Sequence, residues 1–515
     1  MTYPSIYNAA VDMVDRNVDE GRASKIAFSD PRAHLTYGEL QARCNRFGNL
    51  LAACGLEREA RVALLLLDTV DFPVVFWGAI KAGVVPVCLN TLLTAEQYAY
   101  ILGDCRAKAL FVSAPLLPGV QARLGELRYL KHIFVCGGEA PPYGLSLHHE
   151  LGLQPAQFDA ADTVADETAF WLYSSGSTGM PKGVRHVHTS PMETARLCGQ
   201  QCLGIHEGDV VFSAAKLFFA YGLGNAMSFP MSVGASAILL PERPTPEAVF
   251  RILEQHQPTL FFGVPTLYAG MLAFAESSPS SGSQRLRLCV SAGEALPAEV
   301  GRAMAARFGV DVLDGVGSTE MLHQYVCNSP GKVRYGTSGR PVPGYEIRLV
   351  DEHGRDVADG ELGEMLVKGP TAAEGYWNQR AKSKTTFEGS WTRTGDKYTR
   401  DADGYFSYQG RTDDMFKVSG IWVSPFEVES ALIGHAAVLE AAVVPKADGD
   451  GLLKPKAFIV LKPGTSIGNG LLEELQAHVK KHAGPWKYPR WVEFVDALPK
   501  TATGKIQRFK LREGR

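Results

Sequence analysis

One segment of this chain combines small residues, hydroxyl groups and a single lysine in a pattern that suits phosphate. It reads WLYSSGSTGMPKG from Trp171 to Gly183, and its start is an apolar strand. Glycines let backbone N–H groups approach phosphate oxygens, hydroxyls add donors, and lysine offsets the charge of a triphosphate. The residues expected to bind phosphate are Ser174, Ser175, Gly176, Ser177, Thr178, Gly179 and Lys182.

This loop differs from the Walker P-loop, in which Gly-Lys is followed by Ser or Thr at the mouth of a helix. Here Pro181 precedes the lysine and Gly183 follows it. The same composition also fits a flexible polar surface loop, so other parts of the chain must decide between the two interpretations.

The composition is that of a multidomain globular protein with small-molecule partners. Of 515 residues, 45% are hydrophobic and 21% charged, and the formal net charge is -3. A prior of roughly 150 residues per domain indicates several packing units. The charge excludes the basic surface that nucleic acid requires. Nine scattered cysteines without zinc spacing predict buried thiols in a reducing cytoplasm.

No targeting or membrane segment is expected. The start of the chain carries Asp12, Asp15 and Asp19 where a signal peptide needs basic and then apolar residues. The most apolar stretch, 62–89, contains three charged residues, whereas a membrane span needs about 20 apolar residues in succession. We therefore expect a soluble cytoplasmic protein.

The elements that must position the loop alternate between strand and helix. A capping box at Thr36 and Glu39 predicts a helix that ends at Gly55. A strand at 62–67, a helix to Ala82 and a strand at 84–88 follow, and further short apolar runs lie at 110–112, 133–135, 170–173 and 237–240. This alternation favours an α/β protein with helices covering largely parallel sheets.

A polar, turn-prone stretch at 410–414 predicts a boundary before a compact unit of about a hundred residues. In that unit Ser424, Pro425 and Glu427 predict the start of a helix that runs to about Ile433.

The loop and four further motifs resemble the adenylate-forming superfamily of acyl-CoA synthetases, luciferases and peptide-synthetase adenylation domains. These motifs are GSTE at 317–320, Tyr398 after TGD at 394–396, GRTDD at 410–414 and PKTATGK at 499–505. The segments KLFFAYGLGN at 216–225 and STEMLH at 318–323 look like the benzoate–CoA ligase branch and its hydroxybenzoate relatives. The superfamily motifs span about 170 to 505, and the branch resemblance covers nearly the whole chain.

The resemblance implies a large multi-subdomain α/β domain with mostly parallel sheets at 1–410 and a small mobile α+β domain at 411–515. It also implies a reaction: ATP and Mg2+ activate an aryl carboxylic acid as an acyl adenylate, and coenzyme A then takes the acyl group as a thioester. No nucleic acid or membrane partner is expected, and the protein is expected to be a monomer or homodimer.

The resemblance also implies roles at the nucleotide. Thr319 contacts phosphate and Glu320 holds the magnesium ion, while Asp396 and Arg411 reach the ribose. Lys505 bridges the carboxylate and the nucleotide during adenylation and is, with Thr319 and Glu320, a catalytic residue. The other residues implied at ATP are Gly293, Glu294, Asp314, Gly315 and Ser318.

Three further groups follow from the resemblance. The acyl group is expected beside Ala220, Tyr221, Gly222, Gly293, Gly315, Val316 and His323. Coenzyme A is expected at Lys417, Ser419, Gly420 and Trp422, and the hinge between the domains at Asp413. His323 is interpreted as orienting the carboxylate or facing a ring substituent, and Lys500, Arg508 and Lys510 as a flexible basic tail.

Two alternatives stay open. The same adenylation with a carrier-protein phosphopantetheine as acceptor fits every motif. A nucleotide-binding protein without catalysis also has this loop, although Lys505 and Glu320 are both present. The aromatic run at 216–225 has no acid to hold an α-ammonium group, which speaks against amino-acid activation.

Overall fold

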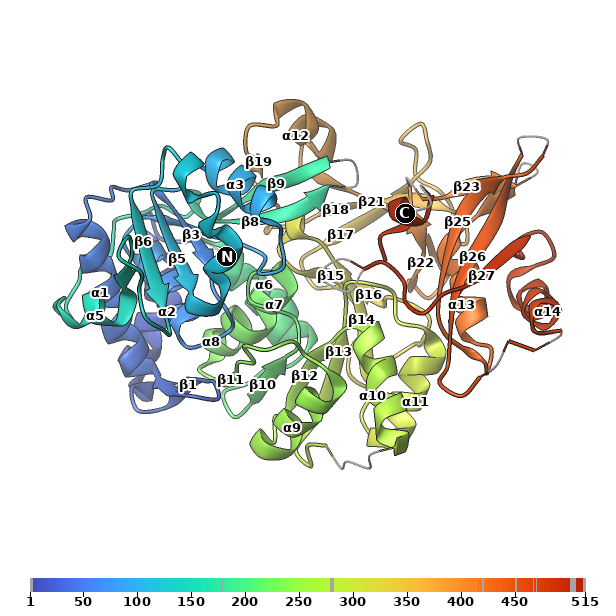
Figure 1. The fold of residues 1–515 in the computed structure, drawn as a ribbon, viewed down its shortest axis with the longest axis horizontal. Coiled ribbons are helices and arrows are strands. Elements are labelled where there is room, and N and C mark those ends of the chain that lie inside the picture. The colour runs from blue at the N-terminus through green and yellow to red at the C-terminus, as the bar shows by residue number, and fades with distance from the viewer. Residues whose placement is uncertain are drawn as a thin grey trace.

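The computed structural model describes residues 3–176, 179–277, 282–412, 414–418, 421–449, 452–465, 467–468, 470–500 and 506–512. These residues form two large α/β units, a third smaller sheet and a separate small unit at the C-terminal end (Figure 1). No helix among them is both long and apolar enough to span a bilayer.

The first unit is an eight-stranded sheet in the order β19-β9-β8-β4-β3-β5-β6-β7 among the described residues. From β8 to β7 neighbouring strands run parallel, and β9 and β19 are antiparallel additions at one edge. The strands are β3 (Arg61–Leu65), β4 (Val85–Cys88), β5 (Ala109–Ser113), β6 (His132–Cys136), β7 (Leu145–Ser146), β8 (Thr168–Gly176), β9 (Gly179–Val187) and β19 (Gly375–Tyr376).

The second unit is a nine-stranded sheet in the order β16-β15-β14-β13-β12-β10-β11-β1-β2 in the described chain. Neighbours from β1 to β14 are parallel, and β2, β15 and β16 are antiparallel. The strands are β1 (Ile26–Ser29), β2 (His34–Thr36), β10 (Val210–Ser213), β11 (Ser236–Ile238), β12 (Leu260–Gly263), β13 (Leu288–Ser291), β14 (Val312–Gly317), β15 (Gln324–Cys327) and β16 (Arg340–Pro341).

Helices cover both faces of each sheet. The α1 helix (Tyr37–Ala53) and the wholly buried α2 (Asp71–Lys81) lie in a core shared by the two sheets. Successive residues of β3 alternate between this shared core and a second core on the outer face under α3 (Ala95–Asp104). The outer face of the nine-stranded sheet packs under α9 (Pro246–His256), α10 (Pro265–Ser277) and α11 (Ala298–Phe308). The alternation follows from the two-residue period of a strand.

Short helices connect these layers. They are α4 (Pro118–Gln121), α5 (Leu147–Gly152), α6 (Ser190–Thr194), α7 (Ala220–Leu223), α8 (Phe229–Val233) and α12 (Arg380–Thr386), with the π-helical turns η1 (Val11–Asp15), η2 (Val18–Arg22), η5 (Ala195–Cys202) and η6 (Gly224–Ser228) and the 3-10 turns η3 (Ala114–Leu116), η4 (Leu124–Glu126) and η7 (Thr319–Met321).

A third sheet lies between the large units and the C-terminal unit. It is built from β17 (Glu346–Val350), β18 (Gly363–Lys368), β20 (Phe387–Glu388), β21 (Trp391–Arg400) and β22 (Phe406–Arg411). The C-terminal unit has its own hydrophobic clusters. Its elements are β23 (Phe416–Val418), β24 (Ile421–Val423), α13 (Pro425–Ile433), β25 (Val438–Ala447), β26 (Leu453–Leu461), α14 (Leu471–Ala483), β27 (Trp491–Phe494) and α15 (Arg508–Arg512).

Local signals in the sequence predicted several elements correctly. Thr36 and Glu39 form the complete capping box of α1. Ser424 caps α13 by accepting from the Glu427 N–H, but the Glu427 carboxylate pairs with Lys487 instead of completing a box. All nine cysteines are free thiols, and eight of them are buried, with Cys54 intermediate.

Candidate active site

The predicted phosphate loop is mostly a β-hairpin. Strand β8 continues to Gly176 and β9 begins at Gly179, so Ser174 pairs directly with Lys182. We expected an irregular loop here, which was wrong, because the two segments satisfy each other's backbone groups as antiparallel neighbours. Ser177 and Thr178 lie outside the described residues, as do the side-chain surroundings of Ser175, Gly176 and Gly179.

Lys182 and Glu320 both contact Tyr376. The Lys182 ammonium lies 4.4 Å from the centre of the Tyr376 ring, and the Tyr376 hydroxyl donates to Glu320 Oε1 at 2.8 Å. Burial lowers the pKa of Lys182, the cations Lys382 and Arg411 lower it further, and Glu320 opposes them. A buried lysine with two further cations near it forms a site that favours an anion.

The turn that carries Thr319 and Glu320 is fixed to the hairpin. Burial lowers the pKa of His186 to about 4, so its neutral ring donates from Nε2 to the Thr319 carbonyl at 2.9 Å. Ser318 caps the same turn through the Met321 N–H. Leu322 follows at φ 65° and ψ -31°, which is strained for a branched residue and turns the chain toward His323.

Asp396 and Arg411 lie opposite each other on β21 and β22. The Arg411 Nη1 donates to Asp396 Oδ1 at 2.9 Å and to the Thr394 carbonyl at 3.1 Å. Asp396 raises the pKa of Arg411. Because Arg411 also acts electrostatically on Lys182, this pair and the hairpin belong to one charged region.

The aromatic segment 216–225 contacts β13 and His323. Tyr221 donates to the Val290 carbonyl at 3.1 Å, and its ring centre lies 5.5 Å from that of His323. Gly222 has no room for a side chain, because a Cβ there would lie 2.1 Å from the Lys216 carbonyl oxygen. Burial lowers the pKa of His323 to about 3, so this histidine is neutral.

The remaining predicted nucleotide residues lie at the ends of β13 and β14. Ser291, which begins the segment leading to Gly293 and Glu294, pairs in register with Asp314. Gly293 has φ 93°, a conformation that favours glycine. Burial raises the pKa of Asp314 well above its usual range. The structure thus brings together, in one region, the predicted nucleotide residues at positions 174, 182, 293, 314–320, 396 and 411.

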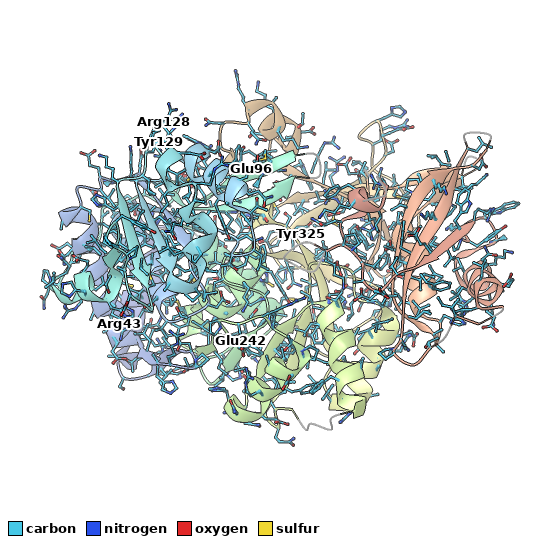
Figure 2. All side chains as sticks on the ribbon, in the orientation of Figure 1. Arg43, Glu96, Arg128, Tyr129, Glu242 and Tyr325 are labelled. Atoms are coloured by element: carbon cyan, nitrogen blue, oxygen red, sulfur yellow. The ribbon has the colours of Figure 1, made fainter. Side chains whose placement is uncertain are left out.

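Tyr325 is a residue at this site that the sequence did not reveal. It lies centrally in the molecule (Figure 2), is fully buried, and its hydroxyl has no hydrogen-bond partner in the described part of the chain. The charges of Asp396, Arg411 and Glu320 all act on that hydroxyl. In the sequence it resembles any core aromatic, so no local signal distinguishes it.

The C-terminal predictions lie partly outside the described residues. This applies to Lys505, Asp413, Ser419 and Gly420, and to the side chains of Lys417 and Trp422. The backbone of 416–418 and 421–423 forms a two-stranded hairpin in which Lys417 is opposite Trp422. The chain on either side of 501–505 is joined by a β-bridge between Lys500 and Ile506.

The interpretation of Lys500 and Arg508 as a flexible basic tail was wrong. Lys500 pairs with Glu440 at 2.6 Å, and Arg508 pairs with the buried Glu429 at 2.7 Å. Buried carboxylates require charged or hydrogen-bonding partners, and the tail supplies them. Lys510 lies in α15.

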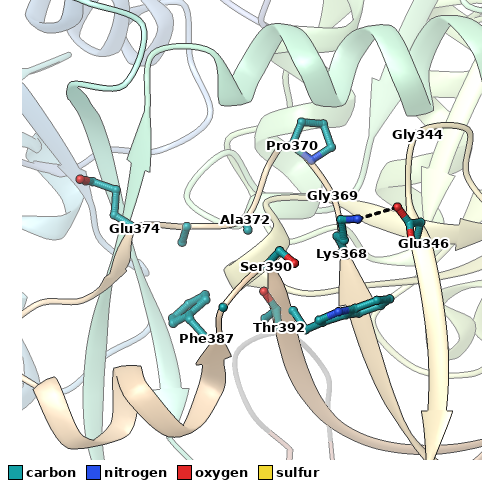
Figure 3. A pocket seen from close by; sticks show the side chains of 13 residues that line it. Gly344, Glu346, Lys368, Gly369, Pro370, Ala372, Glu374, Phe387, Ser390 and Thr392 are labelled. Atoms are coloured by element: carbon teal, nitrogen blue, oxygen red, sulfur yellow. Dashed lines mark hydrogen bonds and ion pairs between the residues drawn. The ribbon is translucent and has the colours of Figure 1, made fainter. Parts of the chain in front are cut away.

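A groove of about 630 Å³ is lined by side chains from β17, β18, β20 and β21 and from the segment 369–374 (Figure 3). The Glu346–Lys368 ion pair stands at its edge, and Phe387, Trp391 and Thr392 form another wall. None of its lining residues belongs to the predicted nucleotide or acyl sets, although the Ala373 N–H donates to the Glu320 carbonyl. The groove is therefore not the predicted acyl site.

Two large α/β units, a smaller linking sheet and a separate C-terminal unit define the class of adenylate-forming enzymes. The family model for the AMP-binding enzymes matches residues 14–377. A second family model, for the AMP-binding enzyme C-terminal domain, matches residues 427–505. The chain belongs to the AMP-binding enzyme family.

Similar proteins cover the whole chain. A 4-hydroxybenzoate–CoA/benzoate–CoA ligase of Rhodopseudomonas palustris is 59% identical, covering 98% of this chain and 94% of that protein. A benzoate–CoA ligase of Thauera aromatica is 56% identical, covering 99% and 96%. The crystal structure of the anthranilate CoA ligase AuaEII in complex with anthranoyl-AMP matches with TM-score 0.96 and 44% identity, covering 99% and 98%.

Proposed function

We propose that this protein is an AMP-forming acid–thiol ligase that converts benzoate or a hydroxybenzoate to its acyl adenylate and then to the aryl-CoA thioester. The observation that carries this function is the full-length identity to benzoate– and hydroxybenzoate–CoA ligases. The site agrees with it, because Lys182, Glu320 and the Asp396–Arg411 pair converge from distant segments.

The charged region suits ATP. Lys182 offsets phosphate charge, and the Asp396 carboxyl, which accepts from Arg411, suits the hydroxyl donors of a ribose. The buried Asp314 carboxyl and the open backbone of Gly293 suit an adenine ring beside β13 and β14.

Glu320 suits a magnesium ion. Its Oε1 accepts from Tyr376, while Oε2 takes no hydrogen bond from the described residues. Magnesium is usually held by one or two carboxylates together with substrate phosphates, so one acid is enough here. When bound, the ion neutralises phosphate charge during attack by the carboxylate. Tyr376 orients Glu320 for this purpose.

We assign the charge-stabilising role in adenylation to Lys505. The Lys500–Ile506 bridge closes the segment that contains it, and Arg508 anchors the following turn to Glu429. We expect Lys505→Ala to slow adenylation by roughly 10²–10³-fold, the effect of removing one preorganised donor. Thioester formation from supplied aryl adenylate should be largely spared. Equal losses in both half-reactions would contradict this role.

The C-terminal unit supplies the second half-reaction in this proposal. A boundary at 410/411 with a hinge at Asp413 lets the unit rotate after adenylation and bring the 416–423 hairpin to coenzyme A. Hinges of this kind absorb backbone changes at a few element-terminal residues. Asp413→Pro should therefore impair thioesterification more than adenylation, and we further propose a cytoplasmic monomer or homodimer.

The function is tested by mass spectrometry of the products. Purified enzyme with ATP, Mg2+ and benzoate or a hydroxybenzoate should give trapped aryl-AMP without coenzyme A, and aryl-CoA, AMP and pyrophosphate with it. Octanoate serves as the comparison acid. If octanoate outperforms every aryl acid, the aryl assignment fails, and if no acid supports pyrophosphate exchange, adenylation itself fails.

Transfer to a carrier-protein phosphopantetheine is the second candidate, because the first half-reaction is the same. Free coenzyme A and a loaded carrier protein, supplied in parallel, separate the two.

A further inference from the structure

A buried glutamine lies at the proposed acyl site. Gln324 is only 1% exposed, and its amide Nε2 donates to the Ser291 carbonyl at 3.2 Å. Its carbonyl Oε1 lies 3.8 Å from the Cys198 thiol and 4.0 Å from the Cys327 thiol. These two thiols are the donors that the described structure gives to this oxygen.

The Gln324 amide occupies the space that Gly315 leaves open. A Cβ on Gly315 would lie 2.3 Å from Gln324 Nε2, so the amide lies directly over the glycine that we expect beside the acyl group. The Tyr221 hydroxyl is influenced electrostatically by Cys198 and Cys327, the same thiols that donate to Gln324. Gln324 therefore faces the region assigned to the aryl ring.

The residue next to Gln324 in the sequence has a polar atom without a hydrogen-bond partner in the described residues. His323 Nε2 pairs with Asn225 Oδ1 at 3.0 Å, which places the ring proton on Nε2 and leaves Nδ1 as a buried acceptor. Buried polar groups without partners are rare in native proteins and need an explanation.

The chemistry of these atoms indicates which ring they fit. A thiol is a weak donor, so Gln324 Oε1 is poorly satisfied, and His323 Nδ1 is an unsatisfied acceptor. Acceptors attract a hydroxyl or amino group and do not attract a carboxylate. The carboxylate of the substrate must therefore point elsewhere, toward the nucleotide.

We propose that Gln324 is a specificity-determining residue that accepts a hydrogen bond from a hydroxyl or amino substituent on the aryl ring. This deepens the proposed function, on which it rests. The preferred substrates are then hydroxy- or aminobenzoates, at the ring position whose substituent reaches the amide. Benzoate itself leaves Oε1 with its thiol donors only.

The test compares kcat/KM for benzoate with that for the three hydroxy, amino and fluoro isomers in the native enzyme and in Gln324→Met. Methionine has a similar length but lacks the amide. For the preferred hydroxy or amino isomer, kcat/KM relative to benzoate should fall roughly 10-fold, the value of one hydrogen bond of about 1.4 kcal/mol. The fluoro isomer of similar size offers no donor and should keep its ratio.

Gln200→Met is the matched control, because Gln200 bonds Ser232 from the same helical segment that carries Cys198. Its substrate ratios should stay unchanged. The proposal is overturned if every isomer ratio changes less than threefold in Gln324→Met, or if the fluoro isomer loses as much as the hydroxy isomer. Failure of the native enzyme to form any aryl-CoA would instead defeat the proposed function.

Discussion

The ion pair between Arg508 and Glu429 should hold the C-terminal unit together. Glu429 is 4% exposed, and it accepts from Arg508 at 2.7 and 3.1 Å and from the Val443 N–H at 2.7 Å. Arg508→Met leaves this carboxylate buried without its cation. Breaking a buried pair in this way costs about 3–5 kcal/mol.

Hydrogen exchange measures this loss within the intact enzyme. A loss of about 3 kcal/mol should speed exchange of peptides from α13 and β25 roughly 100-fold, since 1.4 kcal/mol is tenfold. Peptides from the eight-stranded sheet should not change. Arg302→Met serves as control, because its pair with Glu299 is exposed on both sides and should contribute at most about 1 kcal/mol.

A double variant separates the charge effect from lost packing. Arg508→Met with Glu429→Leu removes both charges, and replacing a buried pair by apolar residues is often neutral. Exchange should therefore return most of the way to the native rate. Unchanged exchange in Arg508→Met, or a double variant as unstable as the single one, would refute the assignment of the pair as the anchor of this unit.

Two further outcomes are expected. Tyr376→Phe removes the hydroxyl that orients Glu320. The Mg2+ concentration needed for half-maximal pyrophosphate exchange should therefore rise about 3–10-fold. By contrast, an ATP-site variant such as Asp396→Asn should raise the KM for ATP. Burial raises the pKa of Asp68 to about 6, so the folded state favours the neutral acid and ionisation costs stability as pH rises from 3.8 through 6. Asp68→Asn should then stabilise the protein by about 3 kcal/mol at pH 7.5 and by less at pH 4.5, measured by denaturant unfolding at both values.

The sequence predicted the helix starts and buried strands that depend on residues close together along the chain. The capping residues of α1 and α13 act within four positions, so Thr36 and Ser424 marked both helix starts. The strands flanking α2 were found because buried parallel strands are continuous apolar runs.

Contacts between segments that are distant in the sequence have no local sequence pattern that predicts them. The pairing of Ser174 with Lys182 made a hairpin out of a segment that composition alone describes as a loop. Arg508 and Glu429 are 79 positions apart, and Tyr325 and Gln324 have the types of ordinary core or surface residues. Their roles depend on which charges and acceptors the fold places beside them.

The contacts between residues up to 412 and those from 414 onward bear on the proposed rotation of the C-terminal unit. In the described structure they include the ring contact of Tyr408 with Phe426 at 5.2 Å, backbone hydrogen bonds from Asp414 and Met415 to the Arg411 carbonyl, and packing of α13 against β22, but no ion pair. Within the unit, by contrast, Arg508 links α15 to α13, and Asp414 joins the same network. Interfaces between domains with few specific contacts permit relative motion, while buried ion pairs resist local opening. A rotation as proposed would therefore break the aromatic contact and the packing of α13 against β22, but no ion pair, and would carry β23 and β24 with the rest of the unit.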